Sequence, residues 1–329
     1  MYIIFVIIAF PAIVMAIRGG ASVDSSSTYP FSVRLTEPIL CGGSIISLNP
    51  PWILTAAHCI ENLQINQNRY TVAYGNKNAT RQSYAAIRQA IVHPLYVSSQ
   101  RQQAQVYATA YTDGIPYDIG LIRLTSSLVA NKFVNRIPLL VNQTTSMDML
   151  ETIGMGYTGY EKPQAEILQF AQCNSSNAET LRDNNYNNSI ILATSNAGLC
   201  HGDSGSPLLV KSSANIDAEY YLGGILNRIL NAYDPDPENG SCPLHESNLT
   251  SFIDSFVKPS AHLKWIMSVT KLSLDDLIDP MTSADGFRMF AAPTSSATTD
   301  APLLLRGAFF GIDWSLLLLM ASLFALINL

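Results

Sequence analysis

A serine flanked by two glycines is the clearest candidate for chemistry in this chain. It lies in the segment Cys200-His201-Gly202-Asp203-Ser204-Gly205-Ser206-Pro207. Glycine lets the backbone bend tightly, so successive N–H groups can point into one small space. A serine there can attack a carbonyl carbon while the N–H groups of Gly202 and Ser204 hold the resulting oxyanion. Because an ordinary glycine-serine turn has the same pattern, this interpretation needs support from elsewhere in the chain.

Two upstream segments supply the groups that such a serine needs. His58 lies in Thr55-Ala56-Ala57-His58-Cys59, and Asp118 precedes the apolar run Ile119-Gly120-Leu121-Ile122. A histidine can take the proton of the serine and return it to the leaving group, while an aspartate holds the imidazole in one tautomer. Taken alone, His58 is more simply a core histidine and Asp118 a turn carboxylate. Their order along the chain, His then Asp then Ser, favours a single site.

These three segments resemble the chymotrypsin/trypsin family of serine proteases, and the resemblance spans roughly residues 17 to 270. It implies a secreted or cell-surface endopeptidase that acts through His58, Asp118 and Ser204 and an acyl-enzyme, without a metal or organic cofactor. The implied partners are protein or peptide substrates and protein inhibitors. One alternative is a weakly active or inactive homologue that binds other proteins. A second is a structural surface protein that works through its tail.

The same resemblance assigns the five cysteines of the chain. It pairs Cys41 with Cys59, beside the histidine, and Cys200 with Cys242, beside the specificity pocket. Cys173 is left over, and we expect it to be a free, buried thiol because no cluster of further ligands supports a metal site.

The chain begins with sixteen almost wholly apolar residues that end in Val14-Met15-Ala16. This stretch is too short to span a membrane and predicts a signal peptide. The next residues, Ile17-Arg18-Gly19-Gly20, resemble the mature start of the family, in which a new terminal ammonium pairs with the aspartate before the serine. The resemblance thus pairs Ile17 with Asp203. Because Ala16 directly precedes Ile17, we expect signal peptidase to create this terminus; cleavage after Arg18 is the alternative.

Short strand-like runs separated by turn residues predict an all-β fold. They fall into two groups, which the resemblance implies are two six-stranded antiparallel barrels, at about residues 31–140 and 151–258. A helix at about 260–270 closes the domain. We expect surface loops at residues 97–116, 174–189 and 230–247.

The resemblance to the family assigns four residues to the specificity pocket: Gly198, Arg228, Ile229 and Asp254. Gly198 stands where trypsins carry an aspartate, and Arg228 and Ile229 stand where the family has tryptophan and glycine. The branched Ile229 should narrow the pocket and favour a small or medium apolar residue before the cut.

The charge at the back of this pocket depends on the alignment. Counting back from Trp265 places Asp254 there, which favours basic as well as apolar residues. Counting forward from Cys242 places Leu249 there instead, and the sequence leaves both alignments open.

The composition and the two ends of the chain limit where this protein works. A net charge of −6 over 329 residues argues against nucleic acid as a partner. Six N-x-S/T sequons, at Asn78, Asn142, Asn174, Asn187, Asn239 and Asn248, suggest a glycoprotein. Residues 271–301 predict a Ser/Thr-rich stalk, and the apolar tail 302–329 predicts a GPI-anchor signal, which would be the only link to a membrane.

Overall fold

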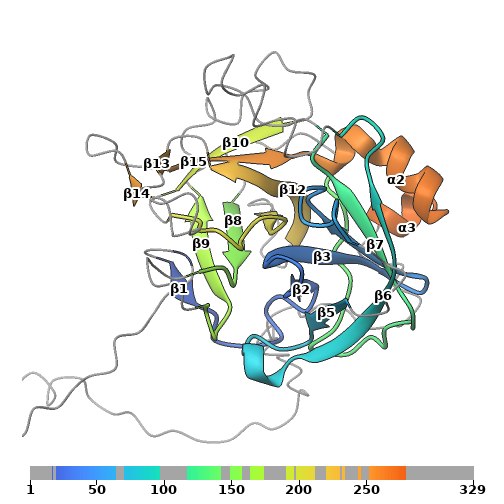
Figure 1. Ribbon diagram of the computed structural model, residues 1–329, viewed down its shortest axis with the longest axis horizontal. Helices are drawn as coiled ribbons and strands as arrows, with labels where there is room; N and C mark the ends of the chain where they lie inside the picture. Colours follow the sequence, from blue (N-terminus) through green and yellow to red (C-terminus); the bar gives the residue numbers. More distant parts are fainter. Residues whose placement is uncertain are drawn as a thin grey trace, which may run out of the picture. The chain divides into compact units, whose positions relative to one another are not determined.

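Two antiparallel β-sheets form the framework of the folded domain (Figure 1). The computed structural model describes residues 17, 20–63, 70–96, 117–141, 149–157, 164–173, 190–195, 198–211, 220–229, 232–233, 244–245 and 252–278. The side chains of 190–195, 229, 232–233, 244–245 and 252–253 are not part of this description. The chain divides into two units, Met1–Ala292 and Pro293–Leu329, and all the described residues belong to the first.

The first sheet is a closed barrel with the strand order β2-β3-β4-β7-β6-β5. Its strands are β2 (Ser32–Leu35), β3 (Cys41–Leu48), β4 (Pro51–Thr55), β5 (Thr71–Tyr74), β6 (Ser83–Val92) and β7 (Gly120–Leu124). Every residue of β4 is buried, as expected of an apolar run rich in β-branched and aromatic residues. This barrel forms one half of the fold predicted from the sequence.

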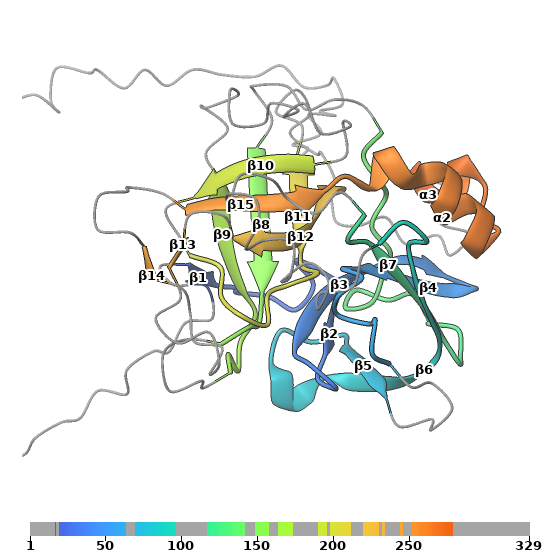
Figure 2. The ribbon, with the colours of Figure 1, turned by 45° about the horizontal axis from the view of Figure 1, so that its top comes forward.

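The second sheet has seven strands in the order β1-β9-β10-β15-β12-β11-β8. They are β1 (Ala21–Ser22), β8 (Met149–Gly154), β9 (Gln169–Cys173), β10 (Ile190–Ser195), β11 (Pro207–Lys211), β12 (Tyr220–Ile229) and β15 (Phe252–Val257). Because β8 also pairs with β9, six of these strands follow one another in a ring, and β1 adds to the edge of β9. The predicted all-β fold with two six-stranded barrels is therefore confirmed (Figure 2).

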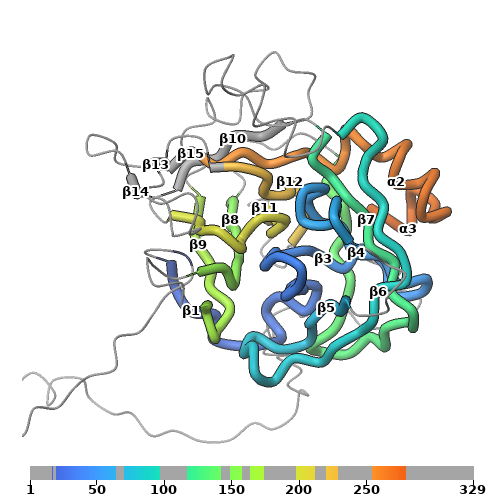
Figure 3. Tube along the Cα trace, in the orientation of Figure 1, coloured from blue at the N-terminus to red at the C-terminus, as the bar shows by residue number. Residues whose placement is uncertain are grey.

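The described end of the chain returns to the first barrel. The 3₁₀ segment η3 (Pro259–His262) leads into helix α2 (Leu263–Thr270), close to the predicted closing helix. In Figure 3 this orange segment runs from the second sheet to the side of β6 and β7. Ile266 of α2 is fully buried. The positive φ of Lys271, at 62°, ends the helix in the left-handed conformation typical of a C-cap.

Several elements differ from the prediction. Strand β15 was not predicted, because the buried polar residues Asp254 and Ser255 interrupt its apolar pattern. The loop at 230–247 contains two short paired strands, β13 (Ala232–Tyr233) and β14 (Leu244–His245). Residues predicted to begin the stalk instead form helix α3 (Leu274–Ile278), whose buried Leu277 accepts a hydrogen bond from the N–H of Leu139. The rest of the predicted stalk and the tail lie outside the described residues.

A short 3₁₀ turn, η2 (Ala79–Arg81), joins β5 to β6, and Asn78 caps it. Within the described part of the chain, no helix is long and apolar enough to cross a membrane.

Candidate active site

Strand pairing in the first barrel brings two of the three predicted catalytic residues to one end. β4 and β7 pair with Thr55 opposite Gly120. His58 follows Thr55 by three residues, and Asp118 precedes Gly120 by two. Because the strands are antiparallel, the end of β4 and the start of β7 meet at the same edge. The pairing of β4 with β7 therefore brings His58 and Asp118 close together.

The His58 and Asp118 side chains form a closely bonded pair. His58 Nδ1 lies 2.7 Å from Asp118 Oδ2, and the backbone N–H of His58 donates to Asp118 Oδ1 at 2.9 Å. Asp118 is fully buried, whereas the His58 side chain keeps 22% of its surface exposed. Burial alone would lower the pKa of His58, but the Asp118 charge and hydrogen bond outweigh it and raise the pKa above 6.5.

Ser204 lies in a tight loop that leads into β11. Gly202 and Gly205, on either side of it, have φ values of +91° and +81°, which favour glycine. The loop is tied to β12, because Gly205 N–H donates to the Leu226 carbonyl and Leu226 N–H donates to Ser206. Its geometry is therefore set by the second barrel.

Two N–H groups of this loop have no acceptor among the described residues. The N–H groups of Cys200, Asp203, Gly205 and Ser206 each donate a hydrogen bond within the structure. Those of Gly202 and Ser204 donate none to any part of the chain that is described. Unpaired backbone donors are uncommon away from water, and these two belong to the residues predicted to bind an oxyanion.

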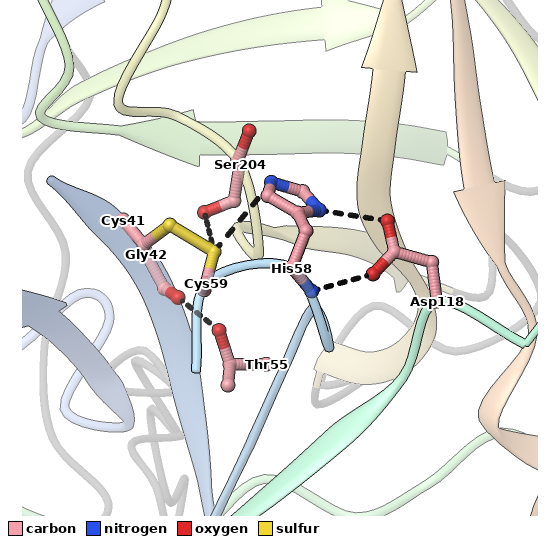
Figure 4. Close-up of a disulfide and its surroundings, with 7 residues drawn as sticks. All are labelled: Cys41, Gly42, Thr55, His58, Cys59, Asp118 and Ser204. Atoms are coloured by element: carbon pink, nitrogen blue, oxygen red, sulfur yellow. Dashed lines mark hydrogen bonds and ion pairs between the residues drawn. A yellow bond between two sulfur atoms is a disulfide. The ribbon is translucent and has the colours of Figure 1, made fainter. Parts of the chain in front are cut away.

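The Cys41–Cys59 disulfide joins the start of β3 to the histidine loop, and both of these segments contact the serine loop (Figure 4). Gly42 N–H donates to the Ser204 carbonyl at 2.7 Å, and Cys59 Sγ lies 3.7 Å from the same oxygen. Cys41, Cys59 and His58 also bring three possible metal-ligand atoms within 4.8 Å of one another. Since both sulfurs belong to the disulfide, they are not thiolates and do not form a metal centre.

Ser204 lies beside the histidine but is not hydrogen-bonded to it. Figure 4 shows Ser204 on the Nε2 side of the His58 ring, with Asp118 on the other side. Among the described residues, Ser204 Oγ makes no hydrogen bond. Such bonds are often long or poorly aligned until substrate binds, so the arrangement is compatible with a nucleophile and its base.

Asp203 is a fully buried carboxylate at the base of the serine loop. It accepts hydrogen bonds from the N–H groups of Gly156, at 2.7 Å, and Cys200, at 2.9 Å. Burial raises the pKa of Asp203 to about 7, although the two hydrogen bonds oppose this rise. Ile17 is also fully buried, in an apolar cluster that includes Leu199 and Leu226.

The predicted pocket residues lie on β12, on β15 and at Gly198. Gly198 is buried, Arg228 pairs with Ser255, and Ile229 pairs with Asp254. This register places Asp254 opposite Ile229, while Leu249 lies outside the described residues. The side chain of Asp254 is fully buried, and neither of its oxygens has a hydrogen-bond partner among the described residues. Burial, together with the nearby Asp203 charge, raises its pKa well above the usual value.

The remaining cysteines are partly described. Cys200 is disulfide-bonded, while its predicted partner Cys242 lies outside the described residues. Cys173 is free and buried, and burial raises the pKa of its thiol. A buried thiol of high pKa is a poor nucleophile and a poor metal ligand.

The sequence analysis did not predict the contacts that hold the serine loop in place. Gly156 donates to Asp203, and both Gly154 and Gly156 leave room for the Asp203 carboxylate, since a Cβ on either would lie under 3 Å from it. Leu40 packs against Gly202 in the same way. Gly154 and Gly156, at the end of β8, could have indicated this contact from the sequence, because glycines in a strand often mark a place where another group approaches the backbone closely.

Comparisons with known proteins agree with this geometry. A family model described as Trypsin matches residues 17–236. Serine protease 28 of Mus musculus is 29% identical over 218 residues, which cover 58% of this chain and 74% of that protein. Chymotrypsin-like elastase family member 1 of Bos taurus is 25% identical over 281 residues, 78% of this chain and 90% of the relative. The solved structure of neuropsin, a mouse serine protease, has a similar fold, with a TM-score of 0.55, 22% identity, and coverage of 76% of this chain and 98% of neuropsin.

Proposed function

Because the chain belongs to the trypsin family of serine proteases, we propose that it is a serine endopeptidase acting through Ser204, His58 and Asp118. The observation that carries this proposal is one small region that holds a serine, a histidine-aspartate pair and two N–H groups with no acceptor in the described part of the chain. Acyl transfer requires a nucleophile, a base with its orienting group and oxyanion donors, and these residues are the candidates for those roles.

The reaction has two halves. Ser204 Oγ attacks the carbonyl carbon of the scissile peptide while its proton passes to His58 Nε2. The carbonyl oxygen becomes an oxyanion and accepts hydrogen bonds from the N–H groups of Gly202 and Ser204. The C–N bond breaks, and His58 gives the proton to the leaving amine. Water then attacks the acyl-enzyme with His58 as base, which releases the acid and restores Ser204.

Two features of the pair fit this role. The pKa of His58 is raised by Asp118, which stabilises the imidazolium that forms during attack. Its exposed fraction of 22% leaves the ring open to a substrate, whereas the fully buried Asp118 is shielded from water. Asp118 therefore orients the ring through its two hydrogen bonds to His58.

We assign Ile17 and Asp203 to activation. In the uncleaved chain no ion pair joins the buried Asp203 to any described cation, and its pKa is about 7. A new ammonium at Ile17 would supply the missing positive charge, and the Ile17 side chain already lies in an apolar cluster. The pair would fix the loop that carries the Gly202 N–H. A secreted protein that is active and begins Ile-Arg-Gly-Gly supports this; an active protein that begins elsewhere contradicts it.

Asp254 determines the substrate preference in this proposal. Leu226 is hydrogen-bonded to the serine loop, and Ile229, opposite Asp254, follows it by three residues, or about 10 Å of strand. A buried carboxylate without any hydrogen-bond partner is costly unless a cation joins it. A lysine or arginine before the scissile bond would bring that cation, so we propose cleavage after basic residues.

Asp254→Asn tests this preference, since it removes the charge and keeps the shape. We expect kcat/KM for a lysine substrate to fall at least about 30-fold relative to a matched leucine substrate, because breaking a buried charge pair costs about 2 kcal/mol or more. Ser255→Ala is the control: it is the adjacent buried polar residue and points to the opposite face of β15. An unchanged ratio in Asp254→Asn would exclude Asp254 from the pocket.

The cellular setting is a further part of the proposal. We propose secretion, N-glycosylation and a GPI anchor formed at the C-terminal tail. Among the six sequons, Asn78 is the one within the described residues, and its Oδ1 accepts hydrogen bonds from the N–H and hydroxyl of Thr80. Release from cells by a phosphatidylinositol-specific phospholipase would support the anchor. Retention of a chain that still carries Trp314–Leu329 would contradict it.

The peptidase proposal is tested with Ser204→Ala. The purified protein should hydrolyse peptide substrates, and Ser204→Ala, prepared in the same way, should retain its fold and lose turnover. The alternative is a homologue that binds proteins without cleaving them. Hydrolysis that survives in Ser204→Ala, or none in the folded wild type with a free Ile17 terminus, would contradict the peptidase.

A further inference from the structure

Asp118 lies at the centre of a three-residue turn. The N–H of Ile119 donates to the carbonyl of Tyr117 at 2.8 Å, which closes the turn around Asp118. Ile119 is fully buried and leads into β7, so the barrel holds the chain after Asp118. On the other side, Tyr117 is the first described residue after the segment 97–116. The position of Asp118 thus depends on what holds Tyr117.

His93 contacts both ends of this turn. Its backbone N–H donates to the carbonyl of Ile119 at 3.0 Å. Its imidazole stacks on the ring of Tyr117, with centroids 5.0 Å apart and planes 19° from parallel. One residue therefore holds the turn through its backbone on one side and through its side chain on the other.

The His93 ring is itself fixed by its surroundings. The N–H of Leu95 donates to His93 Nδ1 at 3.2 Å, which places the proton of the neutral ring on Nε2. His262 and Trp265, from η3 and α2, approach edge-on with centroids 5.0 and 4.9 Å away. His93 is 7% exposed, and burial lowers its pKa, so the ring stays neutral near pH 7. The closing helix thus clamps the ring against Tyr117.

We propose that His93 is a positioning residue for the reaction: its stack on Tyr117 fixes the turn that aims the Asp118 carboxylate at His58. This inference deepens the proposed peptidase function and depends on it for its kinetic readout. Both Asp118 oxygens are already engaged with His58, so a small rotation of the turn would lengthen one or both bonds. Displacements of about 1 Å at such a site cost up to about 100-fold in rate.

The test compares His93→Ala, which removes the ring, with His93→Phe, which keeps an aromatic ring for the stack. We expect His93→Ala to lower kcat about tenfold or more with KM within about twofold, and His93→Phe to recover most of the loss. Leu95→Ala is the control, because its exposed side chain belongs to the same segment but makes none of these contacts. A wild-type kcat in folded His93→Ala would overturn the proposal.

A proton NMR measurement separates positioning from stability and from the peptidase proposal. The His58 Nδ1–H bonded to Asp118 should give a low-field resonance, which we expect to shift or broaden in His93→Ala and to return in His93→Phe. A residue needed only for stability would lower the melting temperature and leave the resonance of the folded protein unchanged, which would overturn the proposal. This readout needs no turnover, so it stands even if the wild type proves inactive. If His93→Ala does not fold, Tyr117→Leu is measured in its place, with the same expected and contradicting results.

Discussion

Gly202→Ala tests whether the conformation of the serine loop serves catalysis. At φ +91° a Cβ is strained, and it would lie 2.5 Å from Leu40 Cδ2 and 3.0 Å from Gly156 Cα. The left-handed conformation costs a residue with a Cβ about 1–2 kcal/mol. The side chain of Leu40 can move, but the backbone of Gly156 cannot move far, so the Gly202 N–H must shift. Loss of one oxyanion donor lowers kcat by about 10²–10³.

Gly75→Ala is the matched control for this variant. Gly75 has a φ of +81°, and a Cβ there would meet only Val134 Cγ2, at 3.3 Å. Both variants should lose about 1–2 kcal/mol of stability from backbone strain. Only Gly202→Ala should lose kcat, since Gly75 follows β5 and a Cβ there would meet Val134 and no residue of the serine loop.

The assay combines urea denaturation with kcat and KM on an amide substrate for both variants. We expect KM to change little in Gly202→Ala, because the oxyanion forms only in the transition state. A wild-type kcat in Gly202→Ala would refute the oxyanion assignment. Equal losses of kcat in the two variants would show that general strain, and not the lost donor, is responsible.

Three other perturbations have defined outcomes. As the pH rises and His58 loses its proton, kcat/KM should rise with a midpoint above 6.5. Asp118→Asn should lower this midpoint and should reduce kcat by about 10⁴. In the uncleaved chain Asp203 has a raised pKa of about 7, so its contribution to the free energy of unfolding is present below pH 4 and is lost as the pH rises toward 7. Asp203→Asn should therefore reduce the pH dependence of the free energy of unfolding, measured by denaturation, by up to about 1.4 kcal/mol per pH unit. Replacing Cys41 and Cys59 together by serine should cost about 3 kcal/mol, measured by urea denaturation, for a disulfide that closes a loop of 18 residues.

The candidate site was predictable where local sequence determines the geometry. The glycines around Ser204 predict a tight loop, and φ values of +91° and +81° confirm it. His58 and Asp118 lie beside short apolar runs that the sequence identifies as strands, but their meeting depends on the pairing of β4 with β7 and was expected only from the family resemblance. The tight loop and the strand positions each depend on a few neighbouring residues.

Features built from distant contacts were not predictable. Asp254 and Ser255 are polar yet buried, so β15 lacks the apolar alternation that marks a strand. The exposed residues of α3 look like a linker, because the burial of Leu277 depends on docking beside Leu139. The stack of His93 on Tyr117 needs segments that are far apart in sequence, and no local pattern reports it.

The central claim is that Ser204 becomes acylated with His58 as its base. Mixing the protein, cleaved before Ile17, with an ester that deacylates slowly should add one acyl group to the intact mass, and peptide mapping should place it on Ser204. The Ser204→Ala and His58→Ala variants should remain unmodified under the same conditions. An unmodified wild type that is folded and has a free Ile17 terminus, or an acyl group on another residue, would contradict the account.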